Sequence, residues 1–156
     1  MGKVLISNAL QKNAVVLNVD SFNDKEAVFD FLADRLEQVQ VVKNKDDFVA
    51  ALNYREKLGP TYMGNFIAIP HGKSKTVVNP GVAFCRCRKP FIYKSADTAG
   101  EVKYIFMLAI PESQAANDYL RVLAALAGML VHQEFIDALE TIESYEQLLL
   151  IIEKWQ

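Results

Sequence analysis

The first part of the chain shows a strand pattern followed by a helix pattern. A short apolar run at Val15–Val19 indicates a strand. Asn23 with Glu26 three residues later is typical of a helix start, because both side chains can satisfy free backbone N–H groups there. Apolar residues then recur at helical spacing, and we expect the helix to end near Gln38, with a buried stripe formed by Val28, Leu32 and Leu36.

A second helix is expected after Asn44, which is a residue type that caps helix N-termini. Phe48 and Leu52 supply its apolar face. Gly59-Pro60 ends it, since proline cannot continue a helix and glycine favours the turn that closes one. Arg55 therefore lies at a helix C-terminus.

Three β-rich segments follow, and the last of them is apolar enough for a central strand covered on both faces. They are Phe66–Ile69, Val82–Cys87 with Phe91–Tyr93 as an open continuation, and Val102–Ile110. The intervening turns or strand ends are expected at Pro80-Gly81, Lys89-Pro90 and Ala99-Gly100.

From Ala115 onward the pattern is helical. One face carries Leu120, Leu123, Leu126 or Ala127, and Leu130, and two shorter helices are expected near Gln133–Leu139 and Ser144–Glu153. Strands interleaved with helices, followed by helices alone, predict an α/β fold: a three-layer α/β/α sandwich with a mixed β-sheet and a helical C-terminal third. We expect residues 1–156 to form a single domain.

Composition and charge reduce the range of possible functions. Hydrophobic residues make up 51% and charged residues 23%, as in ordinary globular proteins. The formal net charge is −2 and no Lys/Arg cluster dominates, so we expect no nucleic-acid partner. No segment approaches the ~20 apolar residues that span a bilayer, so we expect no membrane insertion. The two cysteines, Cys85 and Cys87, indicate core packing in a reducing cytoplasm rather than a redox or metal pair.

His71 is one of two histidines and follows the apolar run Ile67-Ala68-Ile69-Pro70. Pro70 holds the preceding residue extended, and Gly72 allows a sharp turn or a close approach to a ligand. Such a junction presents the ring at the carboxyl end of a strand, where ligands gather in open α/β sheets. With a pKa near ~6.5 the ring is largely neutral at physiological pH and can attack phosphorus. His71 is thus a candidate phosphoryl acceptor, and which nitrogen reacts is left open.

Arg55 and Thr61 are candidate partners for that chemistry. A guanidinium grips phosphate oxygens with two donors, and the Thr61 hydroxyl could donate one more bond or orient His71. Each residue also has a structural explanation when taken alone. Arg55 complements its helix C-terminus, Thr61 stabilises the turn after Pro60, and a histidine after a strand often satisfies a loop carbonyl.

These residues together resemble the signature of the fructose/mannitol-type enzyme IIA of the bacterial sugar phosphotransferase system, the type-2 EIIA family. The resemblance covers nearly the whole chain. It is carried by Arg55-Glu56, Pro60-Thr61, Gly64, Ile67 to Ser74, Asn79 to Ala83, Phe106 to Pro111 and the helix Leu120–Leu130.

The resemblance implies that His71 receives a phosphoryl group from phospho-HPr and passes it to a cysteine or histidine of a sugar-specific enzyme IIB. It implies that Arg55 and Thr61 are active-site partners, that Gly72 adjoins the phosphate site, and that neither a metal nor an organic cofactor takes part. We expect His71 to lie in a shallow depression ringed by Met63, Phe66 and Tyr119, because two proteins must reach it in turn.

One position departs from the family pattern. Many members carry a second histidine where this chain has Tyr119, in Asp118-Tyr119-Leu120. A phenol donates a hydrogen bond to phosphate but carries no positive charge. Tyr119 is therefore either a neighbour of the phosphate or an anchor that packs its helix on the sheet. His132, the other histidine, does not match that position.

Two other functions stay open beside the carrier. A regulatory module would signal through the phosphorylation of His71 without feeding a transporter. A histidine-based hydrolase is disfavoured, because no Ser, Cys or Asp motif pairs recognisably with His71. The motifs are closer to fructose-type than to mannitol-type members, but a carrier does not touch the sugar, so the sugar is not encoded here.

Overall fold

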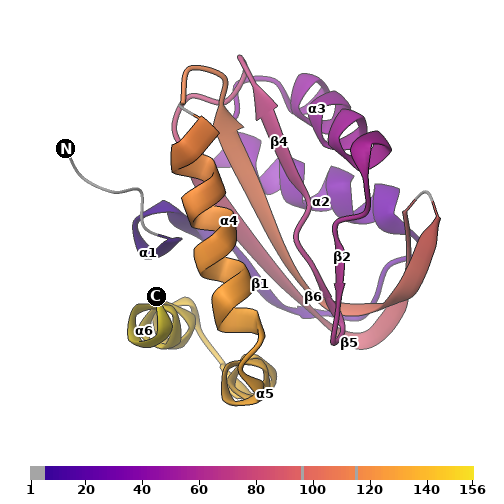
Figure 1. The fold of residues 1–156 in the computed structure, drawn as a ribbon, viewed down its shortest axis with the longest axis vertical. Helices are drawn as coiled ribbons and strands as arrows, with labels where there is room; N and C mark the ends of the chain where they lie inside the picture. The colour runs from indigo at the N-terminus through magenta and orange to yellow at the C-terminus, as the bar shows by residue number, and fades with distance from the viewer. Residues whose placement is uncertain (1–5, 96, 115) are drawn as a thin grey trace.

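The computed structural model describes residues 6–95, 97–114 and 116–156. Within these residues, six strands form one sheet with helices on both faces (Figure 1). The elements in chain order are α1 Ile6–Ala9, β1 Leu10–Val19, α2 Lys25–Gln38, α3 Lys45–Leu58, β2 Tyr62–Gly64, β3 Ile67–Ala68, β4 His71–Ser74, β5 Gly81–Ser95, β6 Thr98–Pro111, α4 Ala116–Leu130, α5 Gln133–Thr141 and α6 Tyr145–Trp155.

The sheet is mixed, as predicted. Its order is β1-β5-β6-β3-β2, and β4 also pairs with β6, further along the same edge as β3. β1 runs parallel to β5, and β3 and β4 run parallel to β6, whereas the β5–β6 and β2–β3 pairs are antiparallel. β3 and β4 are therefore two consecutive segments along the same side of β6.

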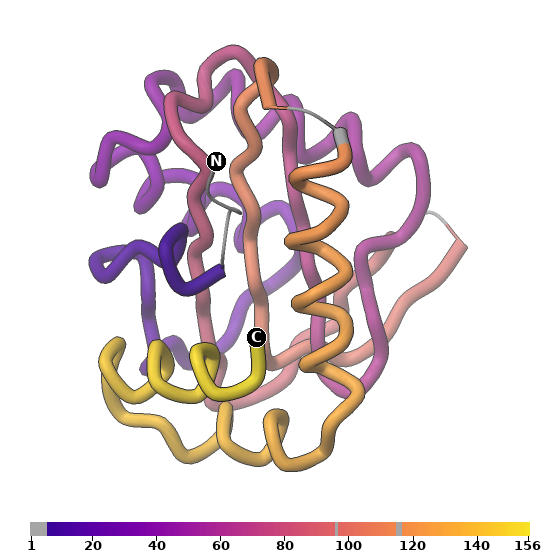
Figure 2. The backbone as a smooth tube through the Cα atoms, turned by 60° about the vertical axis from the view of Figure 1, so that its left-hand side comes forward, coloured from indigo at the N-terminus to yellow at the C-terminus, as the bar shows by residue number. Residues whose placement is uncertain are grey.

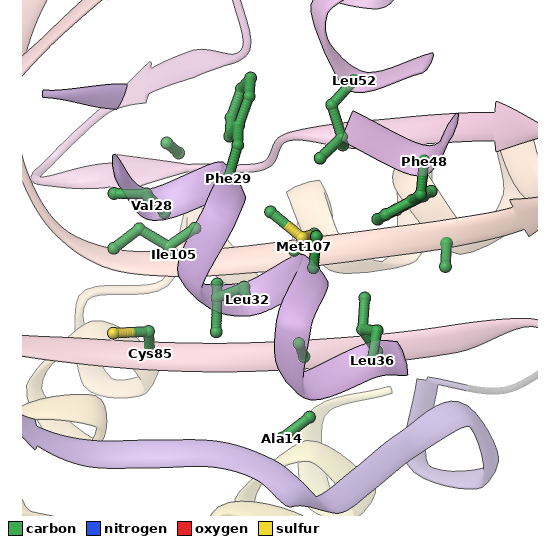
Figure 3. Close-up of a cluster of buried hydrophobic side chains, with 14 of the residues drawn as sticks. Ala14, Val28, Phe29, Leu32, Leu36, Phe48, Leu52, Cys85, Ile105 and Met107 are labelled. Carbon is green, nitrogen blue, oxygen red and sulfur yellow. The ribbon is translucent and has the colours of Figure 1, made fainter. Parts of the chain in front are cut away.

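Two hydrophobic clusters, one on each face of the sheet, form the core. On the first face, α2 and α3 pack on β5 and β6, and Figure 3 shows α2 residues such as Phe29 and Leu32 over Cys85, Ile105 and Met107. Cys85 and Cys87 are free and buried in this cluster, which agrees with their predicted packing role. On the second face lie α4, α5 and α6 (Figure 2), and the buried cluster there includes Phe84 and Phe106. The three-layer α/β/α prediction is thus confirmed.

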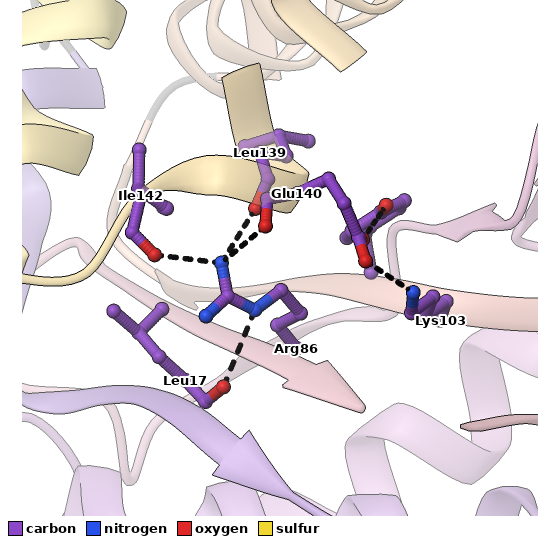
Figure 4. A network of polar contacts seen from close by, with 7 residues as sticks. Leu17, Arg86, Lys103, Leu139, Glu140 and Ile142 are labelled. Atoms are coloured by element: carbon purple, nitrogen blue, oxygen red, sulfur yellow. Dashed lines mark hydrogen bonds and ion pairs between the residues drawn. The ribbon is translucent and has the colours of Figure 1, made fainter. Parts of the chain in front are cut away.

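Arg86 ties the C-terminal helices to the sheet. Its NH1 group donates to the carbonyls of Leu139, Glu140 and Ile142 at 2.7 to 3.2 Å, and its Nε donates to Leu17 O at 3.2 Å (Figure 4). The last carbonyls of a helix have no partner within it, so a guanidinium at this place both caps α5 and pins it to β1 and β5.

The helix boundaries follow the sequence signals closely. Asn44 caps α3 by accepting from Asp47 N at 3.0 Å, and α3 ends before Gly59. α2 ends at Gln38 as predicted, but its N-cap is Asp24 rather than Asn23. Within the described part of the chain, no single helix is long and apolar enough to cross a membrane; α4 from Asn117 and α5 meet that test only jointly, across an 87° bend.

Two predictions for the strands were wrong. Lys89-Pro90 does not form a turn, because β5 runs through it with an irregular register between Arg86 and Phe91, where Lys89 N bonds to Asp20 O. The sharp turn expected after Pro70 is also absent: β3 ends at Ala68, and His71 then opens β4, which continues extended beside β6.

Candidate functional site

Arg55 is presented by the last turn of α3, at the edge of the sheet. The helix closes at Gly59, whose φ of 156° is readily adopted only by glycine. This turn brings the Gly59 carbonyl to NH1 of Arg55, which donates to it at 2.9 Å. The guanidinium is thereby held at the helix terminus, and its Nε–H group is free to bond to a residue outside the helix.

His71 is fixed by backbone on either side of it. The carbonyl of the preceding Pro70 accepts from Leu108 N at 3.0 Å, which pins the edge to β6, and Ile69 N donates to Thr61 O at 2.9 Å. Nδ1 of the ring lies 2.9 Å from Ile69 O, and Nε2 accepts a hydrogen bond from Nε of Arg55 at 3.0 Å. Ring position and ring orientation are thus both determined by contacts.

These two bonds decide the tautomer of His71. The Nε of arginine can only donate, so Nε2 must offer its lone pair. A carbonyl can only accept, so Nδ1 must carry the hydrogen and donate it to Ile69 O. The structure therefore fits a neutral ring with its proton on Nδ1 and its lone pair on Nε2.

The surroundings favour this neutral ring. Burial lowers the pKa of His71 below its ordinary value of 6.5, and the positive charge of Arg55 lowers it further. The Ile69 carbonyl and the Glu56 carboxylate act in the opposite direction without reversing the shift. A larger fraction of His71 is consequently unprotonated at physiological pH than of a free imidazole.

Thr61 does not reach His71 with its side chain. Its buried hydroxyl donates to Glu56 at 2.5 Å and lies 2.7 Å from the Tyr93 hydroxyl. Glu56 is itself buried, and it also accepts from Ser95 Oγ at 2.9 Å. Thr61 thus differs from the expected donor to His71 or phosphate: it links the end of α3 to β5, and only its carbonyl acts on the site, through Ile69.

Gly72 also has a different role from the one expected. It makes no sharp turn, because it lies within β4 and pairs in register with Ala109. A Cβ at this position would lie 3.2 Å from Ala51 Cβ, from Leu52 N and from Phe48 Cε1. The glycine lets β4 approach α3 closely, which is what brings His71 within reach of Arg55.

Two cavities meet at the Arg55–His71 pair, and both residues line both of them. The first, of about 320 Å³, is called here the Lys73 cavity; its other lining residues are Ala51, Tyr54, Leu58, Lys73, Ile110, Glu112 and Tyr119. The second, of about 350 Å³, is called the Met63 cavity and is also lined by Pro60, Thr61, Met63, Ile69, Leu120, Leu123, Ala124 and Ala127.

The expected rim of the site is present in part. Met63 and Tyr119 line these cavities, whereas Phe66, 46% exposed, lines neither. Three exposed residues that were not expected at the site also border it: Tyr54 and Leu58 on α3, and Leu120 on α4. For two of them the sequence held a signal, because Tyr54 and Leu58 are large hydrophobic residues one helical turn apart beside Arg55.

Comparison with known proteins identifies the family of the chain. Residues 8–155 match the family described as the phosphoenolpyruvate-dependent sugar phosphotransferase system, EIIA 2. The chain belongs to this EIIA 2 family. Its members are phosphoryl-transfer components.

Relatives of this EIIA 2 chain include transport and regulatory proteins. The fructose-specific EIIABC component of Bacillus subtilis (strain 168) is 32% identical over 94% of this chain, which spans 23% of that protein. The nitrogen regulatory protein IIA-Ntr of Neisseria meningitidis is 31% identical, with a TM-score of 0.83 over 94% of this chain and 98% of that one. Enzyme IIA-Mtl of Escherichia coli, solved in complex with phosphorylated enzyme IIB-Mtl, is 23% identical and shares the fold, with a TM-score of 0.75 over 93% and 99% of the two chains.

Other candidate chemistry lies outside this site or is not found. His132 is at the start of α5, and its ring lies 4.8 Å from that of Trp155, so it takes no part in the Arg55–His71 arrangement. Among the residues that the structure describes, no group of three or more His, Cys, Asp or Glu side chains could hold a metal ion.

Proposed function

We propose that this EIIA 2 chain is a phosphocarrier that accepts a phosphoryl group on Nε2 of His71 from phospho-HPr and passes it to a sugar-specific enzyme IIB. One observation carries the proposal: the ring donates from Nδ1 to Ile69 O, so that its lone pair on Nε2 faces the guanidinium of Arg55. A nucleophile and a cation for the transferred anion are thus in contact before any donor binds.

The transfer step follows from this geometry. First, the hydrogen bond from Nε of Arg55 to Nε2 of His71 opens. The lone pair on Nε2 then forms the Nε2–P bond, while the bond between phosphorus and the donor nitrogen breaks and its electron pair returns to the donor. The ring keeps its Nδ1 proton, and the carbonyl of Ile69 stabilises the positive charge that the ring then carries. The released N–H groups of Arg55 turn to the phosphoryl oxygens. Transfer to enzyme IIB repeats these events in reverse order.

The other site residues act by position in this proposal. Thr61 holds Ile69, whose carbonyl orients His71, and Gly72 keeps β4 against α3. The chain works as one EIIA domain in the cytoplasm, where its protein partners meet it. The apolar residues around the site, Met63 and Leu120 among them, offer these partners a docking surface.

Intact-mass analysis tests the carrier directly. Wild-type protein is incubated with phosphoenolpyruvate, enzyme I and HPr, beside the variants His71→Ala and His132→Ala. We expect a phosphate-sized increment in wild type and in His132→Ala and none in His71→Ala. An increment that persists in His71→Ala would overturn the assignment of the acceptor.

A regulatory role is the second candidate, and the likeness to IIA-Ntr of Neisseria meningitidis favours it. In that case His71 takes up phosphate as above, but the product is a signal rather than a supply for transport. Adding purified fructose-type enzyme IIB domains to the phosphorylated chain separates the two. Loss of the increment with labelling of enzyme IIB supports the carrier, and retention of the phosphate supports the regulator.

A further inference from the structure

The two cavities beside His71 differ in the charge that they offer an anion. In the Met63 cavity, every lining residue other than Arg55, His71 and Thr61 is apolar, and the Thr61 hydroxyl is occupied by Glu56. The Lys73 cavity adds a second cation and a phenol, from Lys73 and Tyr119. A doubly charged phosphoryl group on Nε2 is therefore better accommodated on the Lys73 side.

Strand geometry directs Lys73 to the same side as His71. The two residues are two positions apart on β4, so their side chains leave the same face of the strand. They pair in register with Leu108 and Ile110 of β6; Leu108 belongs to the buried cluster on the α4 side of the sheet, and Ile110, two positions further along the strand, shares its face. The ammonium of Lys73 and the ring of His71 thus border one cavity.

Tyr119 fixes where that ammonium lies. Nζ of Lys73 is 5.3 Å from the centroid of the Tyr119 ring, at a distance typical of a cation–π contact. Among the ion pairs formed by the described residues none includes Lys73, although Glu112 lies on the rim of the same cavity. The positive charge is held by an uncharged partner and stays available to an anion.

We propose that Lys73 is a catalytic residue that binds the phosphoryl oxygens during transfer to and from His71, and that Tyr119 is the positioning residue that holds its ammonium over the site. This inference rests on the proposed function. Arg55 and Lys73 then supply one positive charge each to the phosphoryl dianion, from two sides of the Nε2–P bond. Tyr119, which stands where many family members have a second histidine, thereby acquires a role: its uncharged ring positions the charge of Lys73.

A small phosphodonor tests Lys73 without any protein partner. With phosphoramidate, the Nε2–P bond forms, the P–N bond of the donor breaks and ammonia leaves, so the rate of mass increase reports on the site alone. We expect Lys73→Gln to slow this reaction by about tenfold, since a charge-assisted hydrogen bond to the phosphoryl group is lost. Lys75→Gln is the matched control, because Lys75 is exposed, lies outside the cavity and changes net charge equally; its rate should equal that of wild type.

A double-mutant comparison tests Tyr119. Tyr119→Phe keeps the ring and should retain more of the rate than Tyr119→Leu, which removes the ring. In the double variant Lys73→Gln/Tyr119→Leu the rate should equal that of Lys73→Gln alone, because the ring acts only through the lysine. Additive losses would overturn the positioning role, and a Tyr119→Phe as slow as Tyr119→Leu would assign the effect to the hydroxyl instead.

The outcomes separate this inference from the function on which it rests. If wild type takes up no phosphate on His71 from either phosphoramidate or phospho-HPr, the phosphocarrier proposal fails. If wild type is phosphorylated and Lys73→Gln matches both it and Lys75→Gln, the carrier stands and the role of Lys73 is overturned.

Discussion

Nε of Arg55 donates its hydrogen bond to Nε2 of His71, the ring nitrogen that keeps a lone pair. The arginine thus orients the proposed nucleophile and at the same time covers it. In the proposed phosphocarrier a phosphoryl group can approach only when this bond opens, and the guanidinium that withdraws is then beside the phosphoryl oxygens. Resting geometry and transfer geometry are related by one movement of one side chain.

The first prediction concerns this contact. Arg55→Lys keeps the charge but cannot hold Gly59 O and Nε2 of His71 together, because an ammonium lacks the planar fork of a guanidinium. We expect the rate of phosphorylation by phospho-HPr to fall by about tenfold or more, since hydrogen bonds to charged groups contribute about 1.5–3 kcal/mol. Arg88→Lys is the control, because the exposed side chain of Arg88 pairs with Asp20, far from His71 in the chain, and lines neither cavity. Equal rates for all three proteins would contradict the role of Arg55.

The second prediction is the tautomer and pKa of His71. Ring ¹⁵N NMR should show the proton on Nδ1 and a midpoint below pH 6.5, because burial and Arg55 both lower the pKa. The sign follows from the charged form: protonation places a hydrogen on Nε2, which removes the lone pair and faces the Arg55 cation, so acceptor capacity is present at higher pH and is lost as pH falls through the lowered pKa. Arg55→Gln should raise the midpoint, since it removes a positive charge. A proton found on Nε2 would refute the assigned hydrogen bonds.

Local signals explain how much of this site could be predicted from the sequence. The cap at Asn44 and the stop at Gly59 act within a few residues, so the end of α3 and the place of Arg55 were predictable. Pro70 wrongly suggested a turn. Proline also fits at the edge of a sheet, where it needs no N–H group: here only its carbonyl bonds to the neighbouring strand, by accepting from Leu108 N. His71 therefore opens a second strand, β4, beside β6 instead of lying in a turn after β3.

Contacts between distant elements were not predictable in this way. The hydroxyl of Thr61 meets Glu56 and Tyr93, which lie on α3 and β5, and no spacing along the chain encodes that meeting. Lys73 carried no signal either, since a lysine on an edge strand is ordinary until α4 places Tyr119 over it. The sequence pattern pointed to the candidate histidine, whereas packing defined its surroundings.

The third prediction tests the buried carboxylate beside Arg55. Glu56 is 5% exposed, accepts from Thr61 and Ser95, and lies 3.6 Å from the ammonium of Lys25. In Glu56→Gln one acceptor oxygen becomes an NH₂ group and Lys25 loses its counter-charge, so the free energy of unfolding should fall by about 1–3 kcal/mol.

Urea denaturation measures this change, with Glu101→Gln as the control. Glu101 is exposed and pairs in register with Ile92 on the neighbouring strand, so its variant should stay within about 0.5 kcal/mol of wild type. If Glu56→Gln is no less stable than Glu101→Gln, the network does not hold the end of α3, and another cause must fix Arg55.

The fourth prediction uses two glycines of opposite character. In Gly72→Ala the new methyl group would lie 3.2 Å from three atoms of α3, one of them the backbone nitrogen of Leu52, which cannot move without the helix. We expect a loss of about 1–3 kcal/mol in the free energy of unfolding, as for other overpacked positions. In Gly128→Ala nothing lies within 4 Å of the new Cβ, and alanine in a helix is favoured over glycine by about 0.5–1 kcal/mol, so this variant should gain stability.

The same pair of glycine variants separates stability from function. β4 can relieve the clash in Gly72→Ala only by moving away from α3, which lengthens the contact between Arg55 and His71. Phosphorylation by phosphoramidate should therefore slow in Gly72→Ala, even at temperatures where the variant is fully folded, and stay unchanged in Gly128→Ala. Were a folded Gly72→Ala to react at the wild-type rate, the spacing between β4 and α3 would not control the site.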